Sequence, residues 1–140
     1  MNTRVTLDSE DSGVVDLAPQ RLPVDATLGD AERLLAEGGL WGVPLVEAGG
    51  DYAGMLTLRS LVAAALPDAL DTALRRRLLD RPAREMIDLE VPVVRVSTKL
   101  PQLLAVLCRR SPVVPIVPDC GMRLLGLASL GRAAHALYRR

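Results

Sequence analysis

Val43-Pro44-Leu45-Val46 and Tyr52-Ala53-Gly54-Met55-Leu56-Thr57 are two apolar stretches separated by the turn residues Ala48-Gly49-Gly50-Asp51. Apolar runs on either side of a Gly-rich turn predict a pair of strands joined by a hairpin. A helical pattern begins directly after the hydroxyl residue Thr57. The stretch therefore predicts a unit of strand, tight turn, strand and helix.

This pattern occurs twice in the chain at a nearly constant spacing. Pro44 recurs as Pro115 and Gly54 recurs as Gly126, so corresponding positions keep almost the same separation along the sequence. A repeat of this kind indicates one folding unit present in two copies. The second copy consists of Val114-Pro115-Ile116-Val117, the turn Pro118-Asp119-Cys120-Gly121, and Arg123-Leu124-Leu125-Gly126-Leu127-Ala128-Ser129.

A further helix is predicted ahead of each strand pair. Thr27 and Asp30 have the spacing of a capping box, and the Gly38-Gly39 pair predicts the helix end. In the second copy, Ser97 and Thr98 are the expected caps of the corresponding helix. Each copy is thus predicted to follow the order β-α-β-β-α.

The predicted fold class is α/β (α+β), with two repeats packed about a pseudo-two-fold axis. We expect residues 1–12 to form a flexible tail and residues 13–80 to form the first repeat. The first repeat includes a connecting helix from Asp68 to Asp80, after Pro67 ends the preceding one. Residues 81–140 form the second repeat, in which Pro82 to Asp88 echoes Gly13 to Leu17.

Composition excludes several classes of protein. The 140 residues carry 17 acidic and 17 basic side chains, and this zero net charge argues against a nucleic-acid partner. No apolar run reaches the roughly 20 residues of a membrane helix, so membrane insertion is not expected. The high apolar content, 49%, favours a homodimer interface. The N-terminus lacks the apolar core of a signal peptide, which predicts a cytoplasmic protein.

Candidate catalytic groups are scarce, and we do not expect an enzyme. His135 is the one histidine, and the sequence contains no G-x-S-x-G motif or phosphate loop. Cys108 and Cys120 do not have a metal-binding spacing. Cys108 is expected to be a buried thiol on an apolar helix face.

Together these stretches resemble a tandem pair of cystathionine β-synthase (CBS) domains, a Bateman module, from about Gly13 to Arg140. The resemblance implies a non-catalytic, stand-alone sensor that binds adenosine-containing ligands between its repeats and forms a flat homodimeric disc. It rests on Val24-Asp25-Ala26-Thr27-Leu28, Val43-Pro44-Leu45-Val46, Gly54-Met55-Leu56-Thr57, Val96-Ser97-Thr98-Lys99-Leu100, Val114-Pro115-Ile116-Val117 and Gly126-Leu127-Ala128-Ser129.

The predicted ligand sites lie where Thr57 and Ser129 begin their helices. A helix N-terminus exposes unpaired N–H groups and the positive end of the dipole, and it can therefore bind a phosphate. The alternative is that both residues only cap their helices. Apolar walls for a base are expected from Val43, Pro44, Val114 and Pro115.

Both copies depart from the family at the position of its ribose-binding acid. The family continues Thr/Ser-x-x-Asp, whereas this chain has Ser60 and Arg132 there. Arg59 lies in the same helical turn as Ser60. We expect Arg59 and Arg132 to bind an anion such as the phosphate of AMP, ADP or ATP, with S-adenosylmethionine as another candidate ligand. The alternative is that both arginines extend into solvent or pair with Asp or Glu.

Two other interpretations remain open. The chain could be a ligand-free dimerisation or protein-interaction module that has lost nucleotide binding, consistent with the missing acids. A tandem of ACT-type domains has a similar element order. The stretches that contain Gly54 and Gly126 lead into helices, which argues against that fold.

Overall fold

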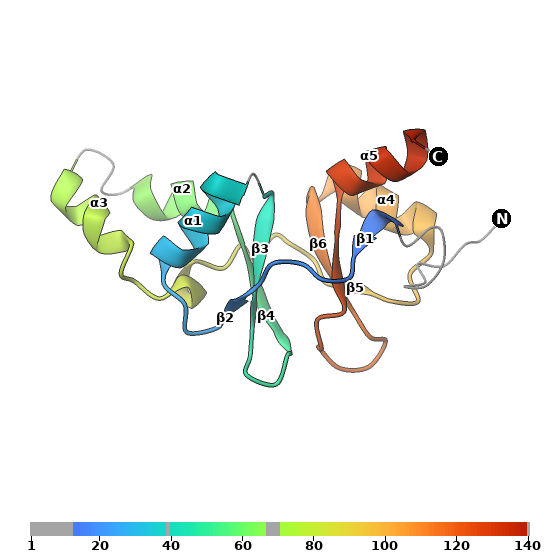
Figure 1. The fold of residues 1–140 in the computed structure, drawn as a ribbon, viewed down its shortest axis with the longest axis horizontal. Helices are drawn as coiled ribbons and strands as arrows, with labels where there is room; N and C mark the ends of the chain where they lie inside the picture. The colour runs from blue at the N-terminus through green and yellow to red at the C-terminus, as the bar shows by residue number, and fades with distance from the viewer. Residues whose placement is uncertain (1–12, 39, 67–70, 140) are drawn as a thin grey trace. The chain divides into compact units, whose positions relative to one another are not determined.

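The computed structural model describes residues 13–38, 40–66 and 71–139, which form two compact units (Figure 1). The central unit is Gln20–Leu89, and the terminal unit joins Met1–Pro19 to Glu90–Arg140. The predicted tail at residues 1–12 and the predicted helix end at Pro67 lie outside the described residues.

The central unit is built on a three-stranded sheet of order β2-β3-β4, in which β3 is parallel to β2 and antiparallel to β4. Its elements are β2 (Leu22–Pro23), α1 (Leu28–Gly38), β3 (Gly42–Val46), β4 (Tyr52–Thr57), α2 (Leu58–Ala65), α3 (Thr72–Leu78) and the 3-10 segment η3 (Ala83–Met86).

The core of the central unit follows from strand alternation. Val43 and Leu45 point to the same face of the sheet, and Leu56 pairs with Val43 on that face. The buried residues of α1 pack onto this face, including Leu28 and Leu35. The predicted capping box starts α1: the Thr27 N–H donates to Asp30 Oδ2 at 3.0 Å, and the Asp30 N–H donates to Thr27 Oγ1 at 3.2 Å.

The terminal unit repeats this plan with one additional strand, in the order β1-β7-β6-β5. The predicted β-α-β-β-α order and the α/β fold class are therefore confirmed in both units. Its elements are β1 (Val15–Asp16), β5 (Val94–Arg95), α4 (Leu100–Arg109), β6 (Val113–Val117), β7 (Gly126–Ser129) and α5 (Leu130–Tyr138).

The segment that leads each sequence repeat is incorporated into the other compact unit. β1 begins the first repeat, yet it pairs with β7 through Asp16 and Leu127. Correspondingly, the N–H of Asp88, which lies near the start of the second repeat, donates to the Met55 carbonyl of β4 at 2.8 Å. The predicted boundary at residues 80 and 81 describes the sequence repeats and stays a prediction; the compact units are divided at residues 19 and 89.

Three local expectations differ from the structure. α4 begins at Leu100 with Lys99 at the N-cap and no side-chain cap hydrogen bond, so the expected caps Ser97 and Thr98 precede the cap position. Ser97 instead donates its N–H to Asp119 Oδ1. The connecting helix α3 covers Thr72–Leu78 and ends before the predicted Asp80, and Asp71 accepts a hydrogen bond from the Leu74 N–H; the predicted start at Asp68 lies outside the described residues. Cys108 is exposed and not buried, because it lies on the outer side of α4.

Candidate functional site

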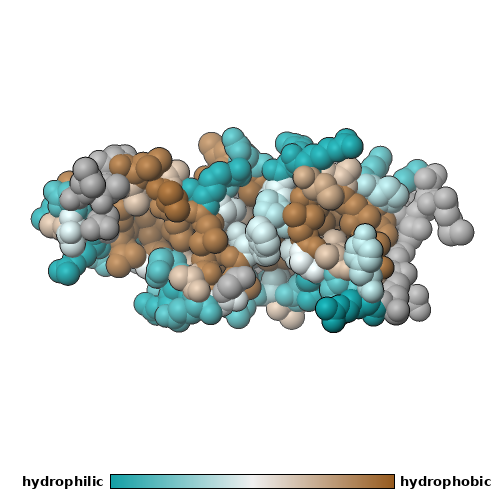
Figure 2. Space-filling model, turned by 90° about the horizontal axis from the view of Figure 1, so that it is seen from above, coloured by the Kyte–Doolittle hydropathy of each residue, from teal (hydrophilic) through white to brown (hydrophobic). Residues whose placement is uncertain are grey.

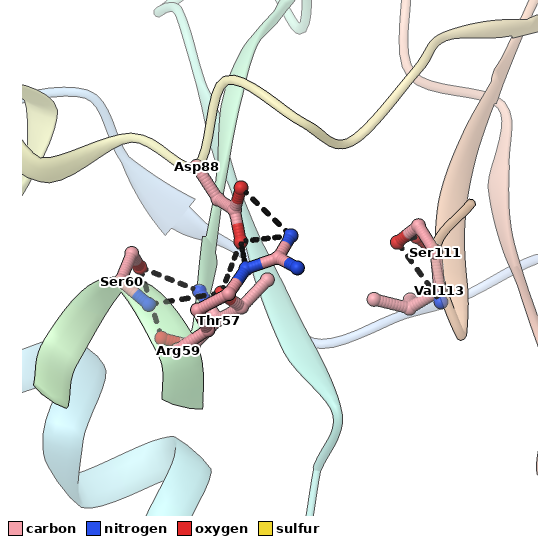
Figure 3. Close-up of polar contacts among 6 residues, drawn as sticks. All are labelled: Thr57, Arg59, Ser60, Asp88, Ser111 and Val113. Carbon is pink, nitrogen blue, oxygen red and sulfur yellow. Dashed lines mark hydrogen bonds and ion pairs between the residues drawn. The ribbon is translucent and has the colours of Figure 1, made fainter. Parts of the chain in front are cut away.

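The start of α2 is a closed capping box. Thr57 has extended backbone angles, and its hydroxyl accepts the Ser60 N–H at 3.1 Å. The Ser60 hydroxyl accepts the Thr57 N–H and donates to the Thr57 carbonyl, both at 2.9 Å (Figure 3). Ser60 therefore supplies the reciprocal cap that an acidic residue supplies in the motif. Its hydroxyl proton is used within the helix cap.

A third residue, Asp88, completes the polar cluster at this helix start. The Thr57 hydroxyl donates to Asp88 Oδ2 at 2.6 Å. Arg59 donates to the same carboxylate through Nε at 3.0 Å, and through Nη2 to Oδ1 at 3.0 Å and to Oδ2 at 2.9 Å (Figure 3). The Asp88 side chain is 5% exposed, whereas that of Arg59 is 55% exposed. The carboxylate is thus buried with charged and neutral donors around it.

Asp88 provides an anion at the place where the sequence predicted a phosphate. The N-terminus of a helix favours negative charge, and a two-pronged arginine contact strengthens the interaction. The pKa of the Tyr52 phenol is raised by burial and by the negative charge of Asp88. Arg59 thus follows the alternative in which an arginine pairs with an acidic side chain.

The start of α5 has different chemistry. Ser129 is extended, and its hydroxyl accepts the Arg132 N–H at 3.3 Å. Ser129 is half-buried and Arg132 is exposed. Among the described residues, neither the Ser129 hydroxyl nor the Arg132 guanidinium contacts an acidic side chain. At the position equivalent to Arg59 in the second repeat, this helix has Gly131.

The counterpart of Asp88 in the terminal unit is Asp16, the acid at the same position of the first repeat. The backbone of Asp16 pairs with Leu127 of β7, much as Asp88 lies beside Met55 of β4. Its side chain nevertheless folds back, and Oδ1 accepts the N–H of Ala18 at 3.0 Å. The two helix starts therefore differ in whether they hold a carboxylate.

The four predicted wall residues are all buried. Val43 and Val114 are 0% exposed, and each lies in the core of its own unit. Their side chains therefore contribute to packing. Pro44 and Pro115 point to the opposite faces of their sheets, because strand residues alternate. Their role as walls stays a prediction.

The central unit also has a hollow of about 440 Å³ beside α2 and η3. Ser60 contributes to its lining, whereas Thr57, Arg59 and Asp88 do not. An ion pair between Arg81 and Glu85, 2.7 Å long and exposed, lies at this hollow. The remaining lining residues are Ala63, Ala64, Met86 and Ile87.

Other chemistry is sparse in the described ranges. They contain no group of three or more His, Cys, Asp or Glu residues able to hold a metal ion. His135 is exposed on α5. None of the helices in these ranges has the length and apolar character needed to cross a bilayer.

Asp88 is the site residue that the sequence reasoning missed. A signal was present, because Val14-Val15-Asp16-Leu17 and Met86-Ile87-Asp88-Leu89 occupy the same positions of the two repeats. The similarity of these stretches does not by itself assign a role to the acid. The contacts of Asp88 join residues 31 and 29 positions apart, so local spacing could not reveal them.

Comparison with known proteins identifies the fold. Residues 1–67 match the family model described as CBS domain. A search of curated proteins found no significant match. A conserved hypothetical protein from Geobacillus kaustophilus has a similar structure, with a TM-score of 0.79, 16% identity and coverage of 99% of this chain and 98% of that one.

Two further solved structures are similar over nearly the whole chain. A CBS-domain-containing protein from Agrobacterium tumefaciens has a TM-score of 0.70 and 22% identity, covering 98% of this chain and 95% of that one. CBSX2, solved in complex with AMP, has a TM-score of 0.74 and 20% identity, covering 98% and 97%. At these identities the similarity establishes a shared fold.

Proposed function

We propose that this chain, a CBS-domain protein by its family match and its fold, is a non-catalytic regulatory module that binds a phosphate-containing ligand at the start of α5. An adenosine nucleotide is the first candidate, since the similar CBSX2 was solved with AMP. ADP, ATP and S-adenosylmethionine are the other candidates.

The observation that supports this ligand class is the contrast between the two helix starts. At α2 the dipole, the hydroxyl and the arginine already neutralise Asp88. At α5 the exposed Arg132 adds positive charge to the helix end, where a cation is unfavourable by about 0.3–1 kcal/mol unless an anion is bound. An external phosphate would relieve this repulsion and accept hydrogen bonds from Arg132.

The test is calorimetric titration of the protein with AMP, ADP, ATP and S-adenosylmethionine. We expect Arg132→Ala to weaken binding of the active ligand about tenfold or more, because it removes a charge-assisted hydrogen bond. Arg139→Ala is the matched control, since Arg139 is an exposed cation at the opposite end of the same helix. No heat from any of the four ligands would contradict the proposed ligand class.

A second candidate function is a protein-interaction module without a small ligand. It is supported by exposed apolar residues along α2 and at its C-cap: Leu58, Val62 and Leu66 are each more than half exposed. Figure 2 shows hydrophobic residues gathered over the central unit, which carries α2, and also over the terminal unit. These residues are spaced four apart, so they form one stripe along the helix. We propose a second copy of this chain as the partner of the stripe.

A flat thermal-melting series with the four ligands would favour this second candidate. A ligand at 100 times its dissociation constant should stabilise the protein by about 2.7 kcal/mol, which gives a clear rise in melting temperature. A regulatory module that acts through a partner alone would show no such rise.

A further inference from the structure

We infer that Asp88 acts as an intramolecular ligand, an autoinhibitory contact that closes the start of α2 to external anions. This role builds on the proposed function in one respect, since both treat a CBS helix start as a place where an anion binds. It differs because it describes the N-termini of α2 and α5 as being in opposite states. The start of α2 is occupied by the chain itself, and the start of α5 is available to a ligand.

The donors at the start of α2 all converge on one carboxylate. Thr57 supplies a hydroxyl at 2.6 Å, and Arg59 supplies Nε and Nη2 at 2.9–3.0 Å. An incoming phosphate would have to displace these bonds one for one. It would also leave Asp88 ionised and 5% exposed without its cation, a costly arrangement.

The backbone holds Asp88 close to these donors. Its N–H donates to the Met55 carbonyl, and Ile87 lies directly over Gly54, where a Cβ atom would come within 2.5 Å of it. A tethered ligand acts at an effective concentration in the millimolar range or above. A free anion that binds the same arginine and hydroxyl with equal affinity must exceed this effective concentration to displace Asp88.

The terminal unit provides an internal comparison. Asp16 has the same backbone placement beside β7, but its carboxylate accepts the Ala18 N–H. The residue equivalent to Arg59 is Gly131, so no guanidinium projects from that position of the first turn, and Arg132 follows one residue later. The position of the arginine in the first turn therefore distinguishes the closed start from the open one.

The experiment removes the internal carboxylate and supplies a free one. We expect Asp88→Ala to bind formate and inorganic phosphate by calorimetry, and both anions to raise its melting temperature more than that of wild type. The double variant Asp88→Ala with Arg59→Ala should lose both effects. Asp16→Ala is the matched control and should show no Arg59-dependent binding. If Asp88→Ala binds neither anion, or if wild type already binds them through Arg59, the role is overturned.

Folding of the variant is itself informative. If Asp88→Ala is unfolded in plain buffer, formate should restore its folded circular dichroism spectrum. If the variant stays unfolded in both formate and phosphate, the proposed role of Asp88 is overturned. In Arg59→Ala, whose side chain is half exposed, the Asp88 amide should exchange with solvent about tenfold or more faster than in wild type. An unchanged exchange rate would contradict the role of Arg59 in holding Asp88.

These results separate the two proposals. Loss of AMP binding in Arg132→Ala tests the ligand site at α5 and does not involve Asp88. Formate binding by Asp88→Ala tests the closed start of α2 and does not require any nucleotide to bind. A protein that gains formate binding but ignores all four ligands would retain the intramolecular role and lose the proposed nucleotide function.

Discussion

Asp16 and Asp88 show how one neighbouring residue changes the use of a carboxylate. Both acids lie beside the strand that precedes a helix start. Arg59 reaches Asp88 from the first turn of α2, whereas Gly131 offers no side chain in the first turn of α5. Asp16 therefore forms a short-range bond to its own turn. A similar backbone placement leads to two different electrostatic environments.

Installing the missing arginine should recruit Asp16. Gly131 has no heavy atom within 4 Å of an added Cβ, so a side chain fits there. Gly131→Ala should stabilise α5 by up to about 1 kcal/mol through helix propensity. In urea unfolding, the free energy of unfolding of Gly131→Arg should be higher than that of Gly131→Ala by up to about 1 kcal/mol, which is the contribution of an exposed ion pair. This difference in unfolding free energy should disappear when both variants also carry Asp16→Asn. A difference that remains would show that Asp16 is not the partner of the new arginine.

Asp30 should make stability depend on pH in the acidic range. The backbone hydrogen bond from Thr27, with a smaller contribution from its hydroxyl, lowers the pKa of Asp30 in the folded protein. A lowered pKa stabilises the folded state above the unfolded pKa, which is about 4, and this contribution is lost as pH falls through the folded value.

Urea unfolding of wild type and Asp30→Asn between pH 2 and pH 7 measures this effect. We expect wild type to be the more stable at neutral pH, and the difference to shrink below about pH 4. Asp25→Asn is the control, because Asp25 is exposed and precedes the helix. A difference between wild type and Asp30→Asn that stayed constant down to pH 2 would exclude a role for the charge.

At the scale of elements, each compact unit depends on a segment borrowed from the other sequence repeat. A glycine makes the close approach possible in both cases. A Cβ at Gly126 would lie 2.7 Å from the Asp16 carbonyl oxygen in β1, and one at Gly54 would meet the side chain of Ile87. Both glycines occupy the same position of the two repeats. Glycine is needed at both positions because the segment that leads the other repeat packs directly against the strand there.

Gly126→Ala should loosen β1 from the terminal sheet. The added methyl group meets a backbone atom that cannot rotate away, and overpacking of this kind costs about 1–3 kcal/mol. Gly49→Ala is the control, because no heavy atom lies within 4 Å of its added Cβ, and its stability should stay equal or rise by up to about 1 kcal/mol. Amide exchange at Val15 and Asp16 should accelerate in Gly126→Ala alone; equal exchange in the two variants would contradict the packing role.

At the scale of the whole molecule, the exposed apolar stripe of α2 bears on assembly. Val62 is 63% exposed in the middle of this stripe. Arg59, the charged residue of α2, already binds Asp88. A face of this kind can pack against its own copy about a two-fold axis without burying unpaired charge.

Val62→Asp should therefore weaken self-association. Burying an unpaired carboxylate in the interface is expected to raise the dissociation constant of the dimer about tenfold or more. Leu89→Asp is the control, because Leu89 is 92% exposed and lies outside the stripe. Sedimentation equilibrium over a range of protein concentrations measures both variants. A Val62→Asp dimer as stable as wild type would exclude this face.

Local patterns could be predicted well because their causes are local. The capping box of Thr27 and Asp30 joins residues three apart, and the helix start at Thr57 follows from the same spacing. Prediction was wrong at the start of α4, where the N-cap is Lys99 and neither Ser97 nor Thr98. Ser97 instead donates its N–H to Asp119, 22 residues away, a contact that local spacing does not show.

The amino-acid sequence by itself determined the duplication, the order of helices and strands, and the positions of both hydroxyl residues at helix starts. These depend on hydrophobic periodicity and on contacts within one helical turn. Only the tertiary structure decided that the leading segments are exchanged and that Asp88 occupies the start of α2. Both outcomes depend on contacts between residues far apart in the chain, where packing and burial of charge select among partners that are equivalent in the sequence.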